Sequence, residues 1–208
     1  MMKIRVVLVS LLAVATVAGL TAFSPVDPQA TNTQATNTQA TETYKVDPVH
    51  STIVFRIKHL GVSYFYGRLN GPYGEFSINP ENSAQCAFDV KVRAKNVDTH
   101  NPRRDGHLKS ADFFNAKQFP NVRFKSKQVT KTGDDTYRVI GDLTLHGVTR
   151  ELTVELKHIG SGPDPWGGHR RGFETSFTIK RSDFGMKFML DGVGDDVTLM
   201  IGIEGTRE

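Results

Sequence analysis

From about Tyr44 onward, apolar and polar residues alternate with a period of two in one segment after another. Successive side chains of a β-strand point to opposite faces, so this pattern predicts strands with one face in a core and the other in water. The apolar positions are Ile53, Phe55, Ile57; Cys86, Phe88, Val90, Val92; Val122, Phe124; Val139, Leu143, Leu145; Leu152, Val154, Leu156; Phe173, Phe177, Ile179; Val197, Leu199, Ile201 and Ile203. The chain is therefore predicted to be all-β.

Hairpin signals rich in Gly, Pro, Asn and Asp separate these segments at residues 79–83, 131–136, 146–151 and 162–172. Many short antiparallel strands with one apolar face each predict a sandwich or a closed barrel. Glycines within or beside the strands favour the barrel, because a curling sheet needs bends and bulges there. About eight strands enclose an interior that side chains fill or that holds one small ligand.

The N-terminal residues predict an export signal. Lys3 and Arg5 precede an apolar run, with small residues such as Ala22 as a cleavage site. The run is shorter than the roughly 20 residues that span a bilayer. We therefore expect a cleaved signal peptide at 1–22, a periplasmic or secreted protein, a disordered Thr/Asn/Gln-rich linker at 23–43 and a barrel domain at 44–208.

The composition limits the partners and the chemistry. The net charge of the 208-residue chain is +4, and two of these charges lie in the predicted signal peptide, so no nucleic-acid partner is expected. Cys86 is the single cysteine, which excludes an internal disulfide. It falls on the apolar phase of its segment and is predicted to be an inert core thiol.

Four ordered segments then resemble the YceI family. They are YKVDPVHSTIVFRIKHLG at 44–61, VDTHNPRRDGHLKSADFFNAKQFPNVRFKS at 97–126, GDLTLHGVTRELTVEL at 141–156 and IKRSDFGMKF at 179–188. The resemblance implies an eight-stranded antiparallel lipocalin-like β-barrel, export to the periplasm, and a polyisoprenoid or fatty-acyl derivative held inside. It also leaves a homodimer and transient membrane association open as partner interactions.

Residues 105–117 lack alternation and end before Pro120, which predicts a short helical segment, capped at Ser110, over one end of the barrel. We expect Arg104 and Asp105 to pair and His107 to bond to backbone, so that these three residues form a structural clasp. The apolar underside of the cover either fills the core or contacts ligand.

Two sets of residues are predicted to bind ligand. An apolar chain such as a polyisoprenoid, an isoprenoid quinone or a fatty-acyl derivative would contact Phe55, Ile57, Phe88, Val90, Phe113, Phe114, Phe119, Phe124, Leu143, Phe177, Ile179 and Phe184. A phosphate or carboxylate head group would suit the cationic and aromatic loop residues Trp166, His169, Arg170 and Arg171, unless these meet only water.

The leading hypothesis is thus a non-enzymatic binding protein with no catalytic residues, no metal and no cofactor other than a bound lipid. One alternative is a metal-dependent or other enzyme acting on an envelope lipid through His100, Asp105 and His107. Another is a stress-protective interaction module whose barrel is packed solid.

Overall fold

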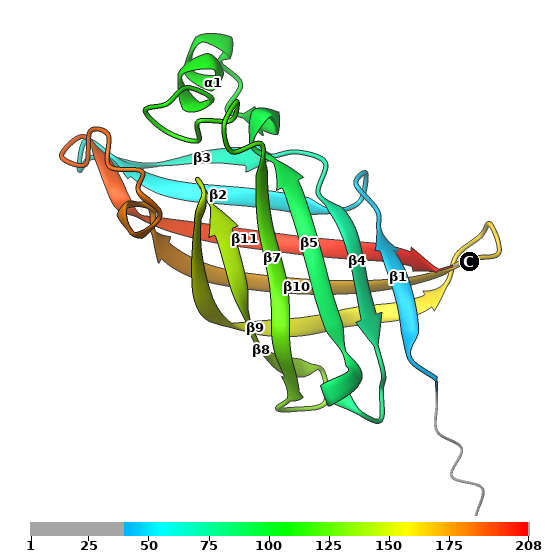
Figure 1. Cartoon of the computed structure of the whole chain (residues 1–208). Helices are drawn as coiled ribbons and strands as arrows, with labels where there is room; N and C mark the ends of the chain where they lie inside the picture. The colour runs from blue at the N-terminus through cyan, green and yellow to red at the C-terminus, as the bar shows by residue number, and fades with distance from the viewer. Residues whose placement is uncertain (1–39, 208) are drawn as a thin grey trace, which may run out of the picture. The chain divides into compact units, whose positions relative to one another are not determined.

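The computed structural model describes residues 40–207, which form one antiparallel sheet closed on itself (Figure 1). The predicted signal peptide and nearly all of the predicted linker lie outside the described residues. Strand β1 begins at Glu42, two residues before the predicted start of the domain. The strands are β1 (Glu42–Val46), β2 (Thr52–His59), β3 (Ser63–Leu69), β4 (Tyr73–Ile78), β5 (Ala87–Arg93), β6 (Val97–Asp98), β7 (Asn121–Lys131), β8 (Thr136–Leu145), β9 (Val148–Pro163), β10 (His169–Lys180) and β11 (Val193–Arg207).

Eleven strand segments make an eight-stranded barrel, because three strands are interrupted. β1 continues into β2, β3 into β4, and β5 into β6 through the 3₁₀ turn η2 (Ala94–Asn96). Each segment then pairs with the next in chain order, and β11 closes the ring by pairing with both β2 and β1. In Figure 1 the strands β4, β5, β7 and β8 cross in front of β2, β3, β10 and β11. The predicted eight-stranded antiparallel barrel is confirmed.

The alternating segments of the sequence become β2, β5 and β7 to β11, with their apolar positions directed inward. Four further segments, β1, β3, β4 and β6, were not predicted as strands. In β3 the exposed positions carry Tyr64 and Tyr66, so the segment is apolar on both faces and shows no alternation. Glycines interrupt β4 and the turn before it.

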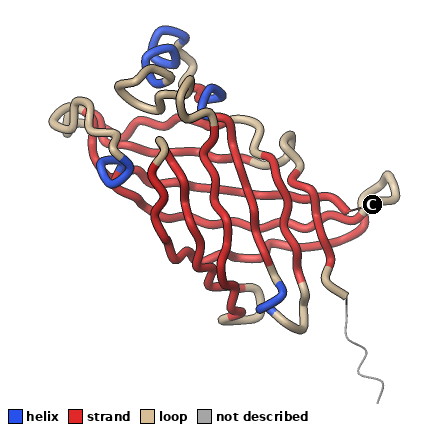
Figure 2. Tube along the Cα trace, viewed as in Figure 1, coloured by secondary structure: helices blue, strands red, loops and turns tan. Residues whose placement is uncertain are grey.

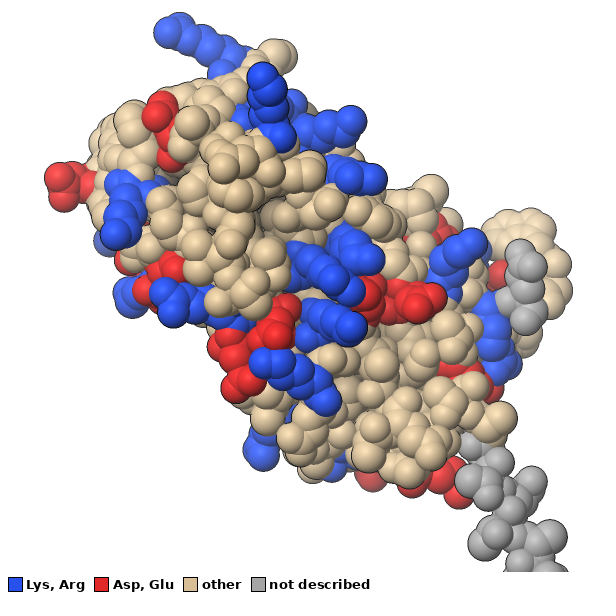
Figure 3. Space-filling view, viewed as in Figure 1, with Lys and Arg blue, Asp and Glu red and all other residues tan. Residues whose placement is uncertain are grey.

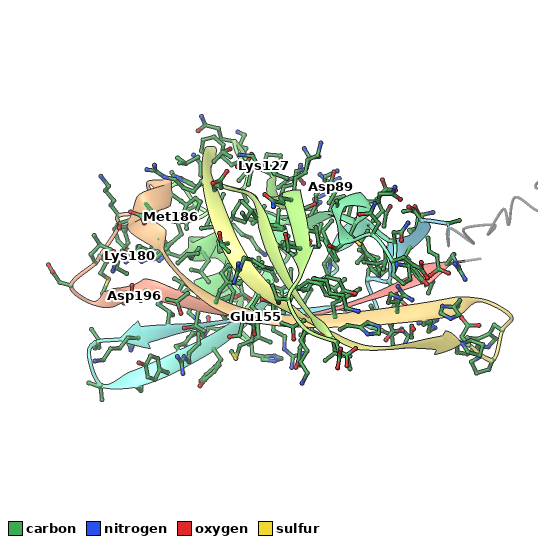
Figure 4. The ribbon with its side chains drawn as sticks, turned by 90° about the horizontal axis from the view of Figure 1, so that it is seen from below. Asp89, Lys127, Glu155, Lys180, Met186 and Asp196 are labelled. Atoms are coloured by element: carbon green, nitrogen blue, oxygen red, sulfur yellow. The ribbon has the colours of Figure 1, made fainter. Side chains whose placement is uncertain are left out.

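The ladder between β9 and β10 covers only part of these strands. Pairing runs from His169↔Pro163 to Glu174↔Lys157 and ends there, although β9 begins at Val148 and β10 continues to Lys180. Glu155, labelled in Figure 4, lies just beyond this point, and its carbonyl accepts a bond from Thr175 Oγ1 at 2.6 Å. Below we call the unpaired stretch the β9–β10 seam.

The helical cover begins and ends earlier than predicted. Helix α1 is Pro102–Leu108, with Asn101 as its N-cap accepting from the Arg104 N–H at 3.0 Å, and residues 109–119 follow in turns. The helix starts before the predicted Asp105 because Pro102 at the first helical position and Asn101 before it supply the start signal. Ser110 caps the turn that follows the helix: its Oγ accepts from the Asp112 N–H at 3.3 Å and its carbonyl from the Asn115 N–H at 2.8 Å. Figure 2 shows the short helices confined to the ends of the barrel. Within residues 40–207, no helix combines the length and the apolarity that crossing a membrane requires.

One end of the barrel is filled by side chains. Phe76, Phe88 and Phe173 pack with ring centroids 5.4–5.7 Å apart, and Tyr44 stacks on Phe76 at 5.2 Å. Cys86 is buried next to this cluster, its Sγ accepting from the Asn79 N–H at 3.3 Å. Burial raises the pKa of the Cys86 thiol, in keeping with the prediction of an inert core cysteine.

Stability is expected to fall in acid because two carboxylates are stabilised in their charged form. Burial alone would raise the pKa of Asp47, but hydrogen bonds from His50, the Val49 N–H and Arg170 hold it well below its usual range. Hydrogen bonds from Arg123 lower the pKa of Asp89. In the unfolded chain both groups protonate near 3.8, so their contribution is present above that pH and is lost as pH falls through the lower folded values.

The urea midpoint should therefore decrease between pH 5 and pH 3, and Asp47→Asn should flatten this decrease. Asp134→Asn is the control, because Asp134 is an exposed carboxylate in the β7–β8 turn. Equal pH profiles for the two variants would contradict this assignment.

Candidate functional site

The barrel interior holds a cavity of about 430 Å³ with an almost entirely apolar wall. Side chains from every strand except β1, β4 and β6 line it, as do residues of α1 and of the turns that follow it. Phe88 and Phe173 close it at the filled end, where they pack against Phe76. The interior is hollow, which counts against the solid-core alternative. A pocket of this size and polarity suits a small apolar ligand.

Ten of the twelve residues predicted to contact an apolar ligand line this cavity. They are Phe55, Ile57, Phe88, Val90, Phe113, Phe114, Phe124, Leu143, Phe177 and Ile179. The structure brings them together because the inward phase of each strand faces the same interior. Phe113 and Phe114 reach it from the turns after α1, so the underside of the cover belongs to the cavity wall.

Phe119 and Phe184 were predicted to line the cavity and do not. The Phe119 ring packs on His146, 5.0 Å between ring centroids, and on Gly147 in the β8–β9 turn. His146 and Gly147 both have positive φ, as a two-residue hairpin turn requires, and a Cβ on Gly147 would lie 2.4 Å from the Phe119 ring. Phe184, in η3 (Arg181–Phe184), is 1% exposed and fills a core cluster with Leu145 and Met186.

The clasp residues hold α1 at the mouth by contacts other than those predicted. Asp105 Oδ1 accepts from the Thr99 N–H at 2.9 Å and from Thr99 Oγ1 at 2.5 Å. Arg104 donates to the same residue, from Nε to Oγ1 at 2.8 Å and from Nη2 to the carbonyl at 2.6 Å. Arg104 and Asp105 therefore both bind Thr99 and do not pair with each other. His107 Nε2 bonds to Asp112 Oδ2 at 2.8 Å and not to backbone.

Arg181 is a buried residue at the mouth. It is 2% exposed, and its guanidinium donates to the carbonyls of Met186, Val193 and Gly194 at 2.7–2.9 Å. Burial lowers its pKa from the ordinary arginine value. Because all three acceptors lie between the end of η3 and the start of β11, Arg181 fixes the loop that borders the mouth. Met186, on this loop, is labelled in Figure 4.

Other lining residues had no sequence signal. Ser63 and Phe65 line the cavity from β3, whose alternation is hidden by its outward tyrosines. Phe188 and Met189 line it from the loop after η3, where no period of two exists. Only the closed barrel brings these segments to the same mouth.

The predicted head-group residues lie at the other end of β10 from η3 and outside the cavity wall. Arg170 is paired with Asp47 at 2.9 Å and Asp164 at 3.3 Å, and also bonds to Glu204. Arg171 lies 3.5 Å from a Glu42 oxygen, and His169 Nδ1 lies 3.2 Å from the Tyr44 hydroxyl. Trp166 is 79% exposed at the tip of the hairpin. These contacts do not favour the predicted head-group role, because carboxylates far away in sequence pair with both arginines.

The residues of the enzyme alternative do not converge. Asp105 is bonded to Thr99 and His107 to Asp112, while the His100 N–H donates to Asp98 Oδ1 at 3.0 Å. Within residues 40–207, the grouping that has metal-ligand geometry is Asp47, His50 and Glu204. The Arg170 guanidinium already bonds to both of these carboxylates, so a cation there would face a fixed positive charge.

A closed antiparallel barrel with one deep apolar cavity and a helical cover at its mouth defines a class of small-ligand-binding barrels. Residues 44–205 match the YceI-like domain, and the chain belongs to the YceI family. It is 43% identical over 167 residues to Protein YceI of Escherichia coli, covering 79% of this chain and 87% of that one.

Two solved structures share the fold. A YceI protein of Campylobacter jejuni superposes with a TM-score of 0.65 at 30% identity, over 73% of this chain and 90% of the other. A domain from Saccharophagus degradans, described as polyisoprenoid binding and implicated in plant cell wall breakdown, superposes with a TM-score of 0.61. It is 13% identical and covers 79% of this chain and 98% of the other, so it supports the fold alone.

Proposed function

We propose that the protein is an exported, non-enzymatic carrier that holds a long apolar chain inside its barrel. The observation that carries this proposal is the closed barrel with an apolar cavity of about 430 Å³. Each methylene withdrawn from water contributes about 0.8 kcal/mol at best, so a long tail binds with few polar contacts. The ligand classes are a polyisoprenoid, an isoprenoid quinone or a fatty-acyl derivative.

The polar end of such an amphiphile would lie at the mouth. His59, Arg104, His107 and Arg181 are cationic or titratable side chains that border the cavity there. Arg104 Nη1 is not used by the bonds to Thr99, which leaves donors for a polar head. This placement of the head group at the mouth is supported by the rest of the cavity wall, which is apolar and offers a polar group few hydrogen-bond partners.

Native mass spectrometry of the protein purified without added detergent tests the proposal. We expect one adduct class, which organic extraction releases as a long-chain lipid, and rebinding of that lipid to the stripped protein. A protein that carries no adduct and binds none of the three ligand classes would overturn the proposal. The protein recovered from the envelope should also have the mass expected without residues 1–22. Light scattering of the same sample would show whether the protein is a homodimer.

A further inference from the structure

We propose that the barrel docks on an anionic lipid bilayer through one edge of its mouth. This edge, the apolar rim, consists of the β2–β3 turn (residues 60–62) and the loop at residues 188–190. The inference deepens the proposed function and rests on it, since it names the surface from which the ligand enters.

The apolar rim exposes more large apolar surface than a solvated loop needs. Val62 is 86% exposed, Leu60 57% and Met189 49%, and Phe188 and Leu190 are also exposed. The two loops are joined, because the Leu60 N–H donates to the Gly192 carbonyl at 2.7 Å. Phe188 and Met189 also line the cavity, so the exposed surface continues directly into the binding site.

The backbone of the rim is strained at two of these residues. Leu60 has φ 49° and Met189 has φ 53°, in the left-handed region that disfavours residues with a Cβ. Glycine, asparagine or aspartate would adopt this conformation more easily and would be more soluble. Large apolar side chains at both positions therefore carry a cost in the isolated protein that burial in lipid would offset.

Positive charge outweighs negative charge beside the rim. The cover at residues 101–118 has four arginines and lysines against two aspartates, and these aspartates are bonded to Thr99 and His107. Lys58 lies two residues before the first rim loop and Lys187 directly before the second, which Asp191 follows. Figure 3 shows lysine and arginine side chains gathered over the α1 end. Apolar tips beside an excess of cations match the interface of an anionic bilayer, where basic groups meet lipid head groups.

Exposed apolar residues also occur elsewhere, and they make a control. Val49 is 81% exposed in the turn between β1 and β2, close to Asp47, which is paired with Arg170. It does not line the cavity. Val49 and Val62 are thus the same residue type at nearly the same exposure, but only Val62 lies on the apolar rim.

The experiment places an environment-sensitive fluorophore at Val62→Cys or Val49→Cys in the full chain, with the buried Cys86 left unlabelled under native conditions. The probes are vesicles of phosphatidylcholine with or without phosphatidylglycerol, whose acyl chains carry bromine as a quencher. We expect the label at 62 to shift to the blue and to be quenched at least threefold more than the label at 49, with anionic vesicles only. Since both variants share the rest of the chain, this difference reports on the rim.

Equal quenching at the two positions, or none at 62, would overturn the docking proposal. Concentration-dependent self-association through position 62 without vesicles would overturn it too, by assigning the rim to a second copy. Binding of a fluorescent fatty acid to the cavity separates this result from the proposed function. If the fatty acid binds but the rim does not dock, only the docking proposal fails; if the rim docks but no long-chain lipid binds, the carrier function fails.

Discussion

Phe177→Asp is expected to weaken binding of a long-chain ligand about a hundredfold, equivalent to about 2.8 kcal/mol. Phe177 lies on β10 with its ring in the cavity wall. The substitution removes an aromatic contact and sets a carboxylate against an apolar chain, where neither water nor a partner compensates its charge. The measurement is titration with a dansyl-labelled fatty acid and a dansyl-labelled isoprenoid alcohol.

Two further variants control this prediction. Ser176→Asp places the same charge on the adjacent, exposed position of the strand and should leave affinity within about twofold of the parent chain. Phe177→Ala removes the ring but keeps the wall apolar, and should lose much less affinity than Phe177→Asp. If Phe177→Asp folds, by its thermal midpoint, and binds both probes as the parent does, the ligand does not occupy the barrel interior.

Gly74→Ala is expected to lower the free energy of unfolding by about 3 kcal/mol or more. Gly74 has φ +130°, and a Cβ there would lie 2.0 Å from the carbonyl oxygen of Asp89 on the paired strand β5. That oxygen belongs to the backbone of the β4–β5 ladder, so it cannot move aside without breaking strand pairing. The urea midpoint measures the loss.

Gly160→Ala is the matched control for this substitution. Gly160 also lies in a paired strand, but no atom lies within 4 Å of the point where a Cβ would stand, and its φ is not positive. Its replacement should be neutral or stabilise by up to about 1 kcal/mol, because alanine restricts the unfolded chain. Equal midpoints for the two variants would show that the close approach at Gly74 does not limit stability.

The sequence predicted those parts of the molecule that depend on local pattern. Inward positions such as Phe55 and Phe177 follow from a period of two, and ten predicted contacts line the cavity for that reason. β3 was missed because Tyr64 and Tyr66 make its outer face apolar as well. The start of α1 was misplaced although Asn101 and Pro102 carry a recognisable start signal.

Contacts between distant segments could not be predicted in this way. Arg170 pairs with Asp47, 123 residues away, and with Glu204, 34 residues away, so its charge is already neutralised where a head group was expected. Phe119 is as apolar as Phe113 and Phe114, which line the cavity, yet its ring packs on Gly147. In both cases the partner is chosen by barrel closure, which brings together ends of strands that sequence spacing keeps apart.

At the β9–β10 seam, the two neighbouring strands of the barrel wall are not joined by backbone hydrogen bonds. Where a ladder is present, separating two neighbouring strands means breaking a row of interstrand hydrogen bonds, but between Val148–Leu156 and Thr175–Lys180 the backbone ladder is absent. Spreading the wall there disturbs mainly side-chain packing, including that of Phe177, which faces the cavity. If the proposed ligand is branched or bulky, local expansion along this line would make room for it while the hydrogen-bonded ladders keep their register.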